Sequence, residues 1–157
     1  RLADTVRRSE RAGVRNLQVR SPIYPDALEG LGGAMDVVFI DAPCTGTGAW
    51  RRHPDTKWRL KPATLKQRMA DQDEVLDRAL TFLKPGGRLV YVTCSILPEE
   101  DEDRVSAFLE RQPDFHVAPA TDSPKLVQHL TDEGYLRLSP YSSGTDGFFV
   151  AVLQRSN

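Results

Sequence analysis

One continuous run of β-branched and aromatic residues, ending in a proline–cysteine pair and a glycine loop, decides the fold of this chain: Asp36-Val37-Val38-Phe39-Ile40-Asp41-Ala42-Pro43-Cys44-Thr45-Gly46-Thr47-Gly48. An apolar run bounded by glycine before it and proline after it is typical of a strand buried on both faces of a parallel sheet. The loop after this strand, residues 42–62, is long and carries glycines and arginines. Loops of that length are uncommon unless they are functional.

Patterns on both sides of this strand predict further helices and strands. Helical spacing closed by Gly13 predicts a helix over residues 2–12. Polar–apolar alternation predicts a strand at residues 16–20, before a loop that holds Pro22, Pro25 and three glycines. An apolar stripe predicts a helix over residues 63–83, stopped by Lys84-Pro85-Gly86-Gly87, and a second buried strand comes next at residues 88–94.

The last third of the chain contains one more helix and then β-like segments. The helix begins at Pro98, and its acidic cluster at residues 99–102 is interpreted as a solvated first turn that matches the helix dipole. Strands are predicted at residues 115–117, 135–138 and 148–153, and the turn at 142–147 makes the last two an antiparallel hairpin. Together these elements predict an α/β domain with a mostly parallel sheet.

Composition excludes several classes of protein. The 157 residues have a net charge of −1 and are 39% hydrophobic, which suits a domain that collapses around a core. No run approaches the roughly 18–20 apolar residues that span a bilayer, so we expect no membrane partner and a cytoplasmic location. Two cysteines exclude a disulfide scaffold or a multi-cysteine zinc site, and no metal is expected. The chain starts with Arg1 instead of Met, so we expect a piece of a longer protein.

Both cysteines come directly after predicted strands, Cys44 in Pro43-Cys44 and Cys94 in Thr93-Cys94-Ser95. Ligands in open α/β sheets bind beyond the carboxyl ends of the strands, and adjacent parallel strands would bring both thiols to one crevice beside Asp41. A free cysteine is often only a small buried hydrophobe, and a regulatory disulfide is a further alternative. The combination of two thiols with an aspartate and a glycine loop favours a catalytic site over these structural alternatives.

The loop after the first of these strands is strongly basic. Residues 51–68 hold seven basic residues against one acid, Asp55: Arg51, Arg52, Lys57, Arg59, Lys61, Lys66 and Arg68. Trp50 and Trp58 lie among them, and aromatic faces can stack on unpaired bases. This pattern indicates RNA binding, although it also fits a solvated loop whose tryptophans pack on the domain.

These segments resemble, in order, motifs of the NOL1/NOP2/Sun (RsmB-type) family of RNA cytosine-5 methyltransferases. The matching segments are Asp41–Gly48 with Arg51-Arg52-His53-Pro54-Asp55 and Trp58, then Leu83-Lys84-Pro85-Gly86-Gly87, Thr93-Cys94-Ser95 and Pro98-Glu99-Glu100, and finally Gly144-Thr145-Asp146-Gly147-Phe148-Phe149. The resemblance covers nearly the whole chain. It implies a Rossmann-like methyltransferase sheet that uses S-adenosylmethionine to methylate RNA, with ribosomal RNA as the family-level expectation.

The resemblance also implies roles for individual residues. Cys94 would be the nucleophile that adds to carbon 6 of cytosine, and Cys44 would assist release of the product. Asp41 and Pro43 would contact the cofactor, with Asp41 also near the target base. The residues expected to bind RNA are Arg51, Arg52, Lys57, Trp58 and Arg59. Spacing alone does not say which cysteine has which role, so the reverse assignment stays open.

Parts of the family pattern are missing from this sequence. No glycine-rich cofactor motif precedes Asp41, and the N-terminal RNA-recognition region is absent. We therefore expect residues 1–157 to be a single partial catalytic domain, with an incomplete cofactor site and no activity alone. The family orders its strands 3-2-1-4-5-7-6. Loss of the first two would expose the strand that ends at Asp41, and open edges invite self-association.

Two other functions are compatible with parts of the sequence. One is a catalytically silent RNA-binding module on the same scaffold, which would have no use for the two cysteines. The other is an amino-group methyltransferase with an aspartate–proline strand end, in which Cys94 would be idle.

Overall fold

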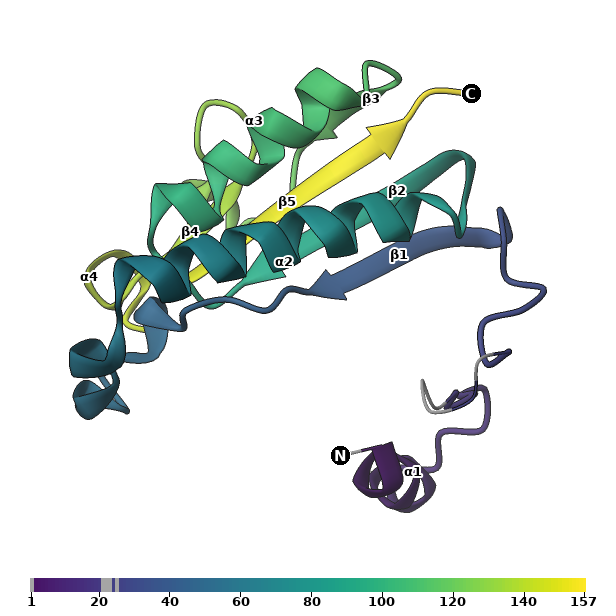
Figure 1. Ribbon diagram of the computed structural model, residues 1–157, viewed down its shortest axis with the longest axis horizontal. Coiled ribbons are helices and arrows are strands. Elements are labelled where there is room, and N and C mark those ends of the chain that lie inside the picture. Colours follow the sequence, from purple (N-terminus) through teal and green to yellow (C-terminus); the bar gives the residue numbers. More distant parts are fainter. Residues whose placement is uncertain (1, 21–23, 25) are drawn as a thin grey trace. The chain divides into compact units, whose positions relative to one another are not determined.

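The computed structural model describes residues 2–20, 24 and 26–157, and the chain divides into two compact units, residues 1–32 and 33–157. The first unit contains helix α1 (Leu2–Arg11), as the helical spacing predicts (Figure 1). Gly13 lies just beyond it with φ of +69°, a left-handed conformation that glycine adopts without steric cost. The amide of Val14 donates to the carbonyl of Ser9 at 3.0 Å, which closes the helix.

Residues 16–20, all of which the structure describes, do not form the predicted strand. Their backbone is irregular and most of their side chains are exposed, with Leu17 at 46%. Alternation makes a strand only where a neighbouring strand pairs with it and one face is buried. The prediction was therefore wrong. Of the loop predicted next, residues 21–23 and 25, which include both prolines, lie outside the described residues.

The second unit is built on a five-stranded sheet. Its strands are β1 (Met35–Asp41), β2 (Leu83–Thr93), β3 (Phe115–Ala118), β4 (Leu136–Leu138) and β5 (Phe148–Arg155) (Figure 1). Their spatial order is β1-β2-β5-β3, and β4 also pairs with β5. This is the 4-5-7-6 half of the strand order that the resemblance implies, and it leaves β1 at an edge.

Only one pairing of this sheet is parallel, so the expectation of a mostly parallel sheet was wrong. β1 and β2 are parallel, whereas β5 runs antiparallel to β2, β3 and β4. The cause is the position of β5. It lies between β2 and β3 and runs opposite to both, so every pairing that involves β5 is antiparallel. The predicted closing hairpin is confirmed, because β4 and β5 pair antiparallel after the short helix α4 (Pro140–Ser143).

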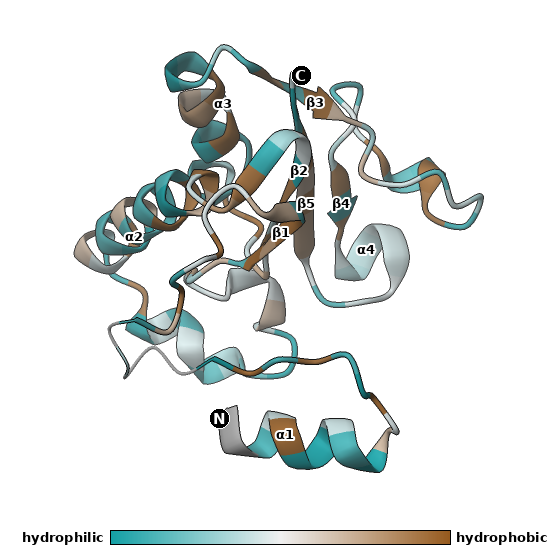
Figure 2. Ribbon diagram, turned by 90° about the vertical axis from the view of Figure 1, so that its right-hand side faces the viewer, coloured by the Kyte–Doolittle hydropathy of each residue, from teal (hydrophilic) through white to brown (hydrophobic). Residues whose placement is uncertain are grey.

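Helices α2 (Pro62–Leu80) and α3 (Glu102–Arg111) cover one face of the sheet (Figures 1 and 2). Strand side chains alternate between faces, so every second residue points to these helices. The core between the helices and the sheet includes Leu76, Val105, Phe108, Leu89, Tyr91, Phe149, Ala151 and Leu153. This packing fixes β1 and β2 beside each other, and it therefore also fixes the loops that leave their carboxyl ends.

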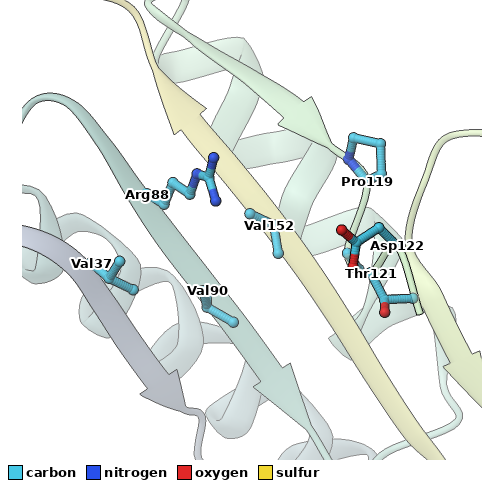
Figure 3. A pocket seen from close by; sticks show the side chains of 8 residues that line it. Val37, Arg88, Val90, Pro119, Thr121, Asp122 and Val152 are labelled. Carbon is cyan, nitrogen blue, oxygen red and sulfur yellow. The ribbon is translucent and has the colours of Figure 1, made fainter. Parts of the chain in front are cut away.

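The opposite face of the sheet is exposed at β1 in the second unit. Val37 and Phe39 of β1 are 53% and 65% exposed, so the expectation that this strand is buried on both faces was wrong. Both long helices of the unit pack on the other side. The open face holds a pocket of about 380 Å³ lined by Val37, Val90 and Val152 and by the loop at residues 119–122 (Figure 3).

The helix α2 begins at Pro62, where the missing N–H of proline costs nothing, and ends at Leu80. The predicted stop, Lys84-Pro85-Gly86-Gly87, begins four residues after Leu80 and forms a bulge inside β2 instead. Met35 pairs with Leu83 and Val37 with Arg88, so residues 84–87 bulge out of the ladder. Within the described residues, no helix is long and apolar enough to cross a membrane.

Candidate active site

The carboxyl ends of β1 and β2 lie side by side and carry both cysteines. Asp41 is opposite Val92, and the amide of Ala42 extends the ladder by donating to the carbonyl of Val92 at 2.9 Å. Cys44 lies three residues after β1 and Cys94 directly after β2. Their Sγ atoms are 3.3 Å apart, and both thiols are free and half-buried. The prediction that the two thiols meet is therefore confirmed.

The contact between the two sulfur atoms separates their pKa values. A hydrogen bond from the Cys44 thiol lowers the pKa of Cys94 to about 7, against opposing effects of burial and of the carboxylates of Asp41 and Glu100. The same contact, together with burial, raises the pKa of Cys44 well above its ordinary value. Since the two groups titrate as a pair, the first proton is lost easily and the second with difficulty. At neutral pH the site can hold one thiolate beside one thiol, and the thiolate is the reactive form.

The other two sequence-predicted residues of this site lie on the same segment. Asp41 is exposed at the end of β1, and its carboxylate makes no hydrogen bond or ion pair among the described residues. Its charge nevertheless acts on Cys94, where it raises the thiol pKa. The carbonyl of Pro43 accepts a hydrogen bond from Nε2 of Gln72 on α2 at 2.9 Å. In the part of the chain that is described, no group of three or more His, Cys, Asp or Glu residues could hold a metal ion.

Two acidic residues near the cysteines are buried, contrary to the interpretation of residues 99–102 as a solvated helix turn. Glu100 and Asp101 are both 0% exposed. Glu100 accepts hydrogen bonds from the loops that carry the cysteines, and Asp101 accepts one from Oγ1 of Thr93 at 2.6 Å. Burial raises the pKa of Asp101 to about 7. The carboxylates are buried because polar groups at the two strand ends need acceptors there.

The sequence contains a signal for the burial of Glu100 and Asp101, although their place in a first helix turn favours solvent exposure. Thr93 and Ser95 flank Cys94 at the end of a buried strand, and buried hydroxyls require hydrogen-bond partners. Acidic residues a few positions later were the nearest acceptors along the chain. Gln72, which interrupts the apolar stripe of α2 and is 0% exposed, is a second such signal.

The basic segment, residues 51–68, has members next to Cys44. A cleft of about 290 Å³ is lined by Cys44, Thr45, Thr56, Arg59, Leu60, Thr64 and Arg68. Trp58 is 79% exposed, and Nζ of Lys57 lies 4.6 Å from its ring centroid. Arg59 pairs with Asp55 at 3.1 Å, with 78% of its side chain exposed. These three residues lie on the 3₁₀ helix at Pro54–Arg59 and present charge and an aromatic face to solvent, and Arg59 lines the cleft beside Cys44.

Arg51 and Arg52 both bind the carboxylate of Asp146, in the loop before β5. Nε of Arg51 donates to Oδ1 at 2.7 Å and Nε of Arg52 donates to Oδ2 at 2.5 Å. The hydrogen bond from Arg52 is the main reason that the pKa of Asp146 is lowered. About half of each arginine side chain stays exposed, so the two positive charges are held in place but not covered.

Gly48, in the loop after β1, and Gly147, in the loop before β5, lie at a close contact between the two backbones, which leaves no room for a side chain. A Cβ on Gly147 would lie 2.4 Å from Cγ2 of Ile96 and 2.8 Å from Cα of Gly48. The amide of Gly147 donates to the carbonyl of Gly48, and the amide of Gly48 donates to the carbonyl of Cys94, both at 2.9 Å. Gly48 and Gly147 thus let the loop after β1 and the loop before β5 touch.

Several solved structures share this fold. The chain superimposes on the crystal structure of PH0851 with a TM-score of 0.80 and 34% sequence identity, covering 94% of this chain and 33% of that one. A methyltransferase homologue from Pyrococcus horikoshii matches with a TM-score of 0.74 and 29% identity, over 98% of this chain and 50% of that one. Fold and site together define the class as Rossmann-like methyltransferases.

Within that class the chain belongs to the 16S rRNA methyltransferase RsmB/F family, whose model matches residues 1–154. A relative named ribosomal RNA small subunit methyltransferase B, from Shewanella oneidensis, is 40% identical over 127 residues, which is 80% of this chain and 28% of that protein. The chain therefore spans about a quarter of the length of the curated relatives it matches. The resemblance of the motifs is confirmed at the level of the family.

Proposed function

We propose that the protein is an S-adenosylmethionine-dependent methyltransferase that modifies carbon 5 of a cytosine in ribosomal RNA, and that these 157 residues are a partial catalytic domain. The observation that carries the proposal is the 3.3 Å contact between the Sγ atoms of Cys44 and Cys94 at two neighbouring strand ends. The family and the names of its members support ribosomal RNA as the substrate.

A pair of thiols suits cytosine because carbon 5 alone is a poor nucleophile. The Cys94 thiolate bonds to carbon 6, and the electron pair of the 5,6 double bond becomes available at carbon 5. S-adenosylmethionine, when bound, supplies the methyl group that carbon 5 takes. Cys44 then assists release: a base takes the proton from carbon 5, the electron pair of that C–H bond restores the 5,6 double bond, and the Cys94 sulfur leaves carbon 6 as a thiolate. The assignment of Cys94 as the nucleophile comes from the family resemblance, and a thiol 3.3 Å away at Cys44 suits it because that thiol can donate a hydrogen bond to a thiolate.

Two residues of this chain fit the cofactor and the base. Asp41 offers an exposed, unshared carboxylate beside the thiols, which suits the ammonium group of the methionine moiety or an amino group of the base. Pro43 holds the turn between that carboxylate and Cys44, and Gln72 fixes its carbonyl. This segment would orient the methyl donor and exclude water from the thiol pair.

The RNA strand would enter over the basic segment. Arg51, Arg52, Lys57 and Arg59 supply positive charge for phosphates, and the exposed ring of Trp58 supplies a stacking surface. The target base must leave its stack for a sulfur atom to reach carbon 6, so single-stranded or extruded cytosine is the substrate form. The cleft beside Cys44 lies where such a base would arrive.

The thiol pair argues against the two competing functions. A silent RNA-binding module has no need for two sulfur atoms in contact, and methyl transfer to an amino group needs no thiolate at Cys94.

The test uses RNA containing 5-fluorocytosine, from which no proton can leave carbon 5, so the covalent adduct persists. With the full-length gene product and S-adenosylmethionine, we expect Cys94→Ala to abolish the adduct and Cys44→Ala to retain it. Loss of the adduct in Cys44→Ala alone would reverse the two roles, and no adduct with the unmodified protein would contradict the mechanism.

A further inference from the structure

Glu100 is a buried carboxylate close to the thiols that takes no part in the proposed reaction. It is 0% exposed, and its partners place it at the junction of three segments: the loop after β1, the loop after β2 and the helix α2. No Lys, Arg or His bonds to its side chain within the described residues. A buried, unpaired charge is costly unless hydrogen bonds compensate it fully.

The compensation comes from four donors, two on each carboxylate oxygen. Oε1 accepts from the amide of Thr45 at 2.8 Å and from Nε2 of Gln72 at 3.1 Å. Oε2 accepts from Oγ1 of Thr45 and from Oγ of Ser95, the latter at 2.6 Å. An ionised carboxylate offers about four acceptor positions, so this one is saturated.

The donors are the direct neighbours of the two cysteines. Thr45 is next to Cys44 and Ser95 is next to Cys94, and both bind the same oxygen of Glu100. Gln72 adds a second link to the first loop, because its Nε2 also binds the carbonyl of Pro43. We propose that Glu100 is a positioning residue that holds the Cys44 and Cys94 loops in register, so that the two sulfur atoms stay in contact. The proposal rests on the proposed function only for the use of the thiols.

The hydrogen bonds around Ser95 require a carboxylate at this position. The Ser95 hydroxyl donates to Glu100 and accepts from the amide of Leu97, and it lies 3.0 Å from Oγ1 of Thr47. Oγ1 of Thr47 in turn accepts from the amide of Ile96, which leaves its own proton for Ser95. This chain of hydrogen bonds passes from Ile96 through Thr47 and Ser95 and ends at the carboxylate of Glu100. A glutamine there would place an N–H where an acceptor is needed, and the loops would separate.

The pKa of Cys94 depends on whether the Cys44 and Cys94 loops stay in register. Cys44 lowers the pKa of Cys94, whereas the charges of Asp41 and Glu100, the two carboxylates that act on it, raise it. A Glu100→Gln change therefore separates two roles. If Glu100 acted only by its charge, the pKa of Cys94 would fall in the variant. If it positions the loops, the Cys44 contact is lost and the pKa rises.

The experiment measures the alkylation rate of each cysteine by iodoacetamide against pH, by mass spectrometry, on the 157-residue chain. In the unmodified chain we expect a midpoint for Cys94 near pH 7. In Glu100→Gln we expect a rise of about one pH unit, which lowers the rate at pH 7 about fivefold because less thiolate is present. Glu99→Gln, at the exposed neighbouring residue, should match the unmodified chain.

A second variant covers the case in which Glu100→Gln does not fold by circular dichroism. Thr45→Val removes one donor and leaves the charge of Glu100 in place, so any rise in the Cys94 midpoint must come from displaced loops. We expect a smaller rise in the same direction. An unchanged or lower midpoint in folded Glu100→Gln, or in Thr45→Val if only that variant folds, would overturn the proposal. Neither measurement needs RNA or cofactor, so the proposed function is tested separately.

Discussion

Asp101 is buried beside the end of β2, and its carboxylate accepts a hydrogen bond from Thr93, the residue before Cys94. The Thr93 hydroxyl donates to Asp101 and accepts from the amide of Ser95, while Arg137 reaches the other oxygen of Asp101 at 3.2 Å. Burial still outweighs these contacts and raises the pKa of Asp101 from 3.8 to about 7. A carboxyl group with such a shift makes stability depend on pH.

For Asp101 we predict stability that falls as pH rises from about 4 to about 7. In that interval the folded chain holds a proton that the unfolded chain has lost, so the stabilisation is complete below pH 4 and disappears through pH 7. The slope is about 1 kcal/mol per pH unit. Urea unfolding at several pH values should show this slope in the unmodified chain, and Asp101→Asn should remove it.

Asp103→Asn, at an exposed residue in the first turn of α3, serves as the control and should keep the slope. An Asp101→Asn variant with the pH dependence of the unmodified chain would refute the assignment.

At the scale of single residues, the meeting of the two thiols was predictable, whereas for their support the sequence indicated only that the buried hydroxyls beside Cys94 need hydrogen-bond acceptors. Carboxyl ends of parallel neighbours share one edge of a sheet, so strand positions alone placed Cys44 near Cys94. The burial of Glu100 depends on Thr45, Gln72 and Ser95 converging from three segments. Such convergence depends on tertiary packing, which local patterns do not encode.

Among the elements, the 3₁₀ helix at Pro54–Arg59 carries an exposed arginine and an exposed tryptophan of the basic segment. Arg59 and Trp58 are mostly exposed there, whereas Arg51 and Arg52 are tied to Asp146. Ion pairs on an exposed surface are worth little to stability, so Arg59 can exchange Asp55 for a phosphate at small cost.

We predict that Arg59→Ala weakens RNA binding several-fold and lowers the slope of log affinity against log salt by about one phosphate contact. Arg7→Ala is the matched control. Arg7 pairs with Asp4 on α1 as Arg59 pairs with Asp55, and 79% of its side chain is exposed against 78% for Arg59. Filter binding of a ribosomal RNA fragment at several salt concentrations measures both. Equal effects of the two changes would remove the argument for a specific RNA surface at Arg59.

The elements themselves were predicted unevenly, for a physical reason. α1 and α2 have strong helical periodicity, and the ends predicted for them lie within a few residues of the observed ends. Residues 16–20 alternate correctly but have no partner strand, because a strand is defined by pairing and not by its own sequence. The bulge at residues 84–87 carries the residues of a helix stop, and only the register between β1 and β2 distinguishes the two.

At the scale of the whole sheet, β1 is an edge strand with an apolar, exposed face. Val37 and Phe39 lie on that face, and β1 pairs only with β2 among the described strands. The position of β5 between β2 and β3, which makes the sheet mostly antiparallel, follows from the strand order that the family resemblance implies, whereas the hairpin pattern alone does not say where a strand inserts. The open edge at β1 follows from the same strand order.

We predict that the 157-residue chain self-associates through this edge at high concentration, because unpaired edge strands with apolar side chains are templates for pairing. Phe39→Lys should shift the chain toward monomer in light scattering, since a charge on an edge strand blocks pairing. Tyr141→Lys, at a fully exposed aromatic residue on α4, should leave the association unchanged. A chain that is monomeric at all concentrations would rule this association out.

The most direct test of the central claim is the identity of the residue bound to RNA. The full-length gene product should be incubated with S-adenosylmethionine and ribosomal RNA containing 5-fluorocytosine, digested, and the cross-linked peptide sequenced by mass spectrometry. The account predicts a bond between carbon 6 of the base and Sγ of Cys94, with Cys44 unmodified. A cross-link at Cys44, or methylation that proceeds with no cross-link at either cysteine, would contradict it.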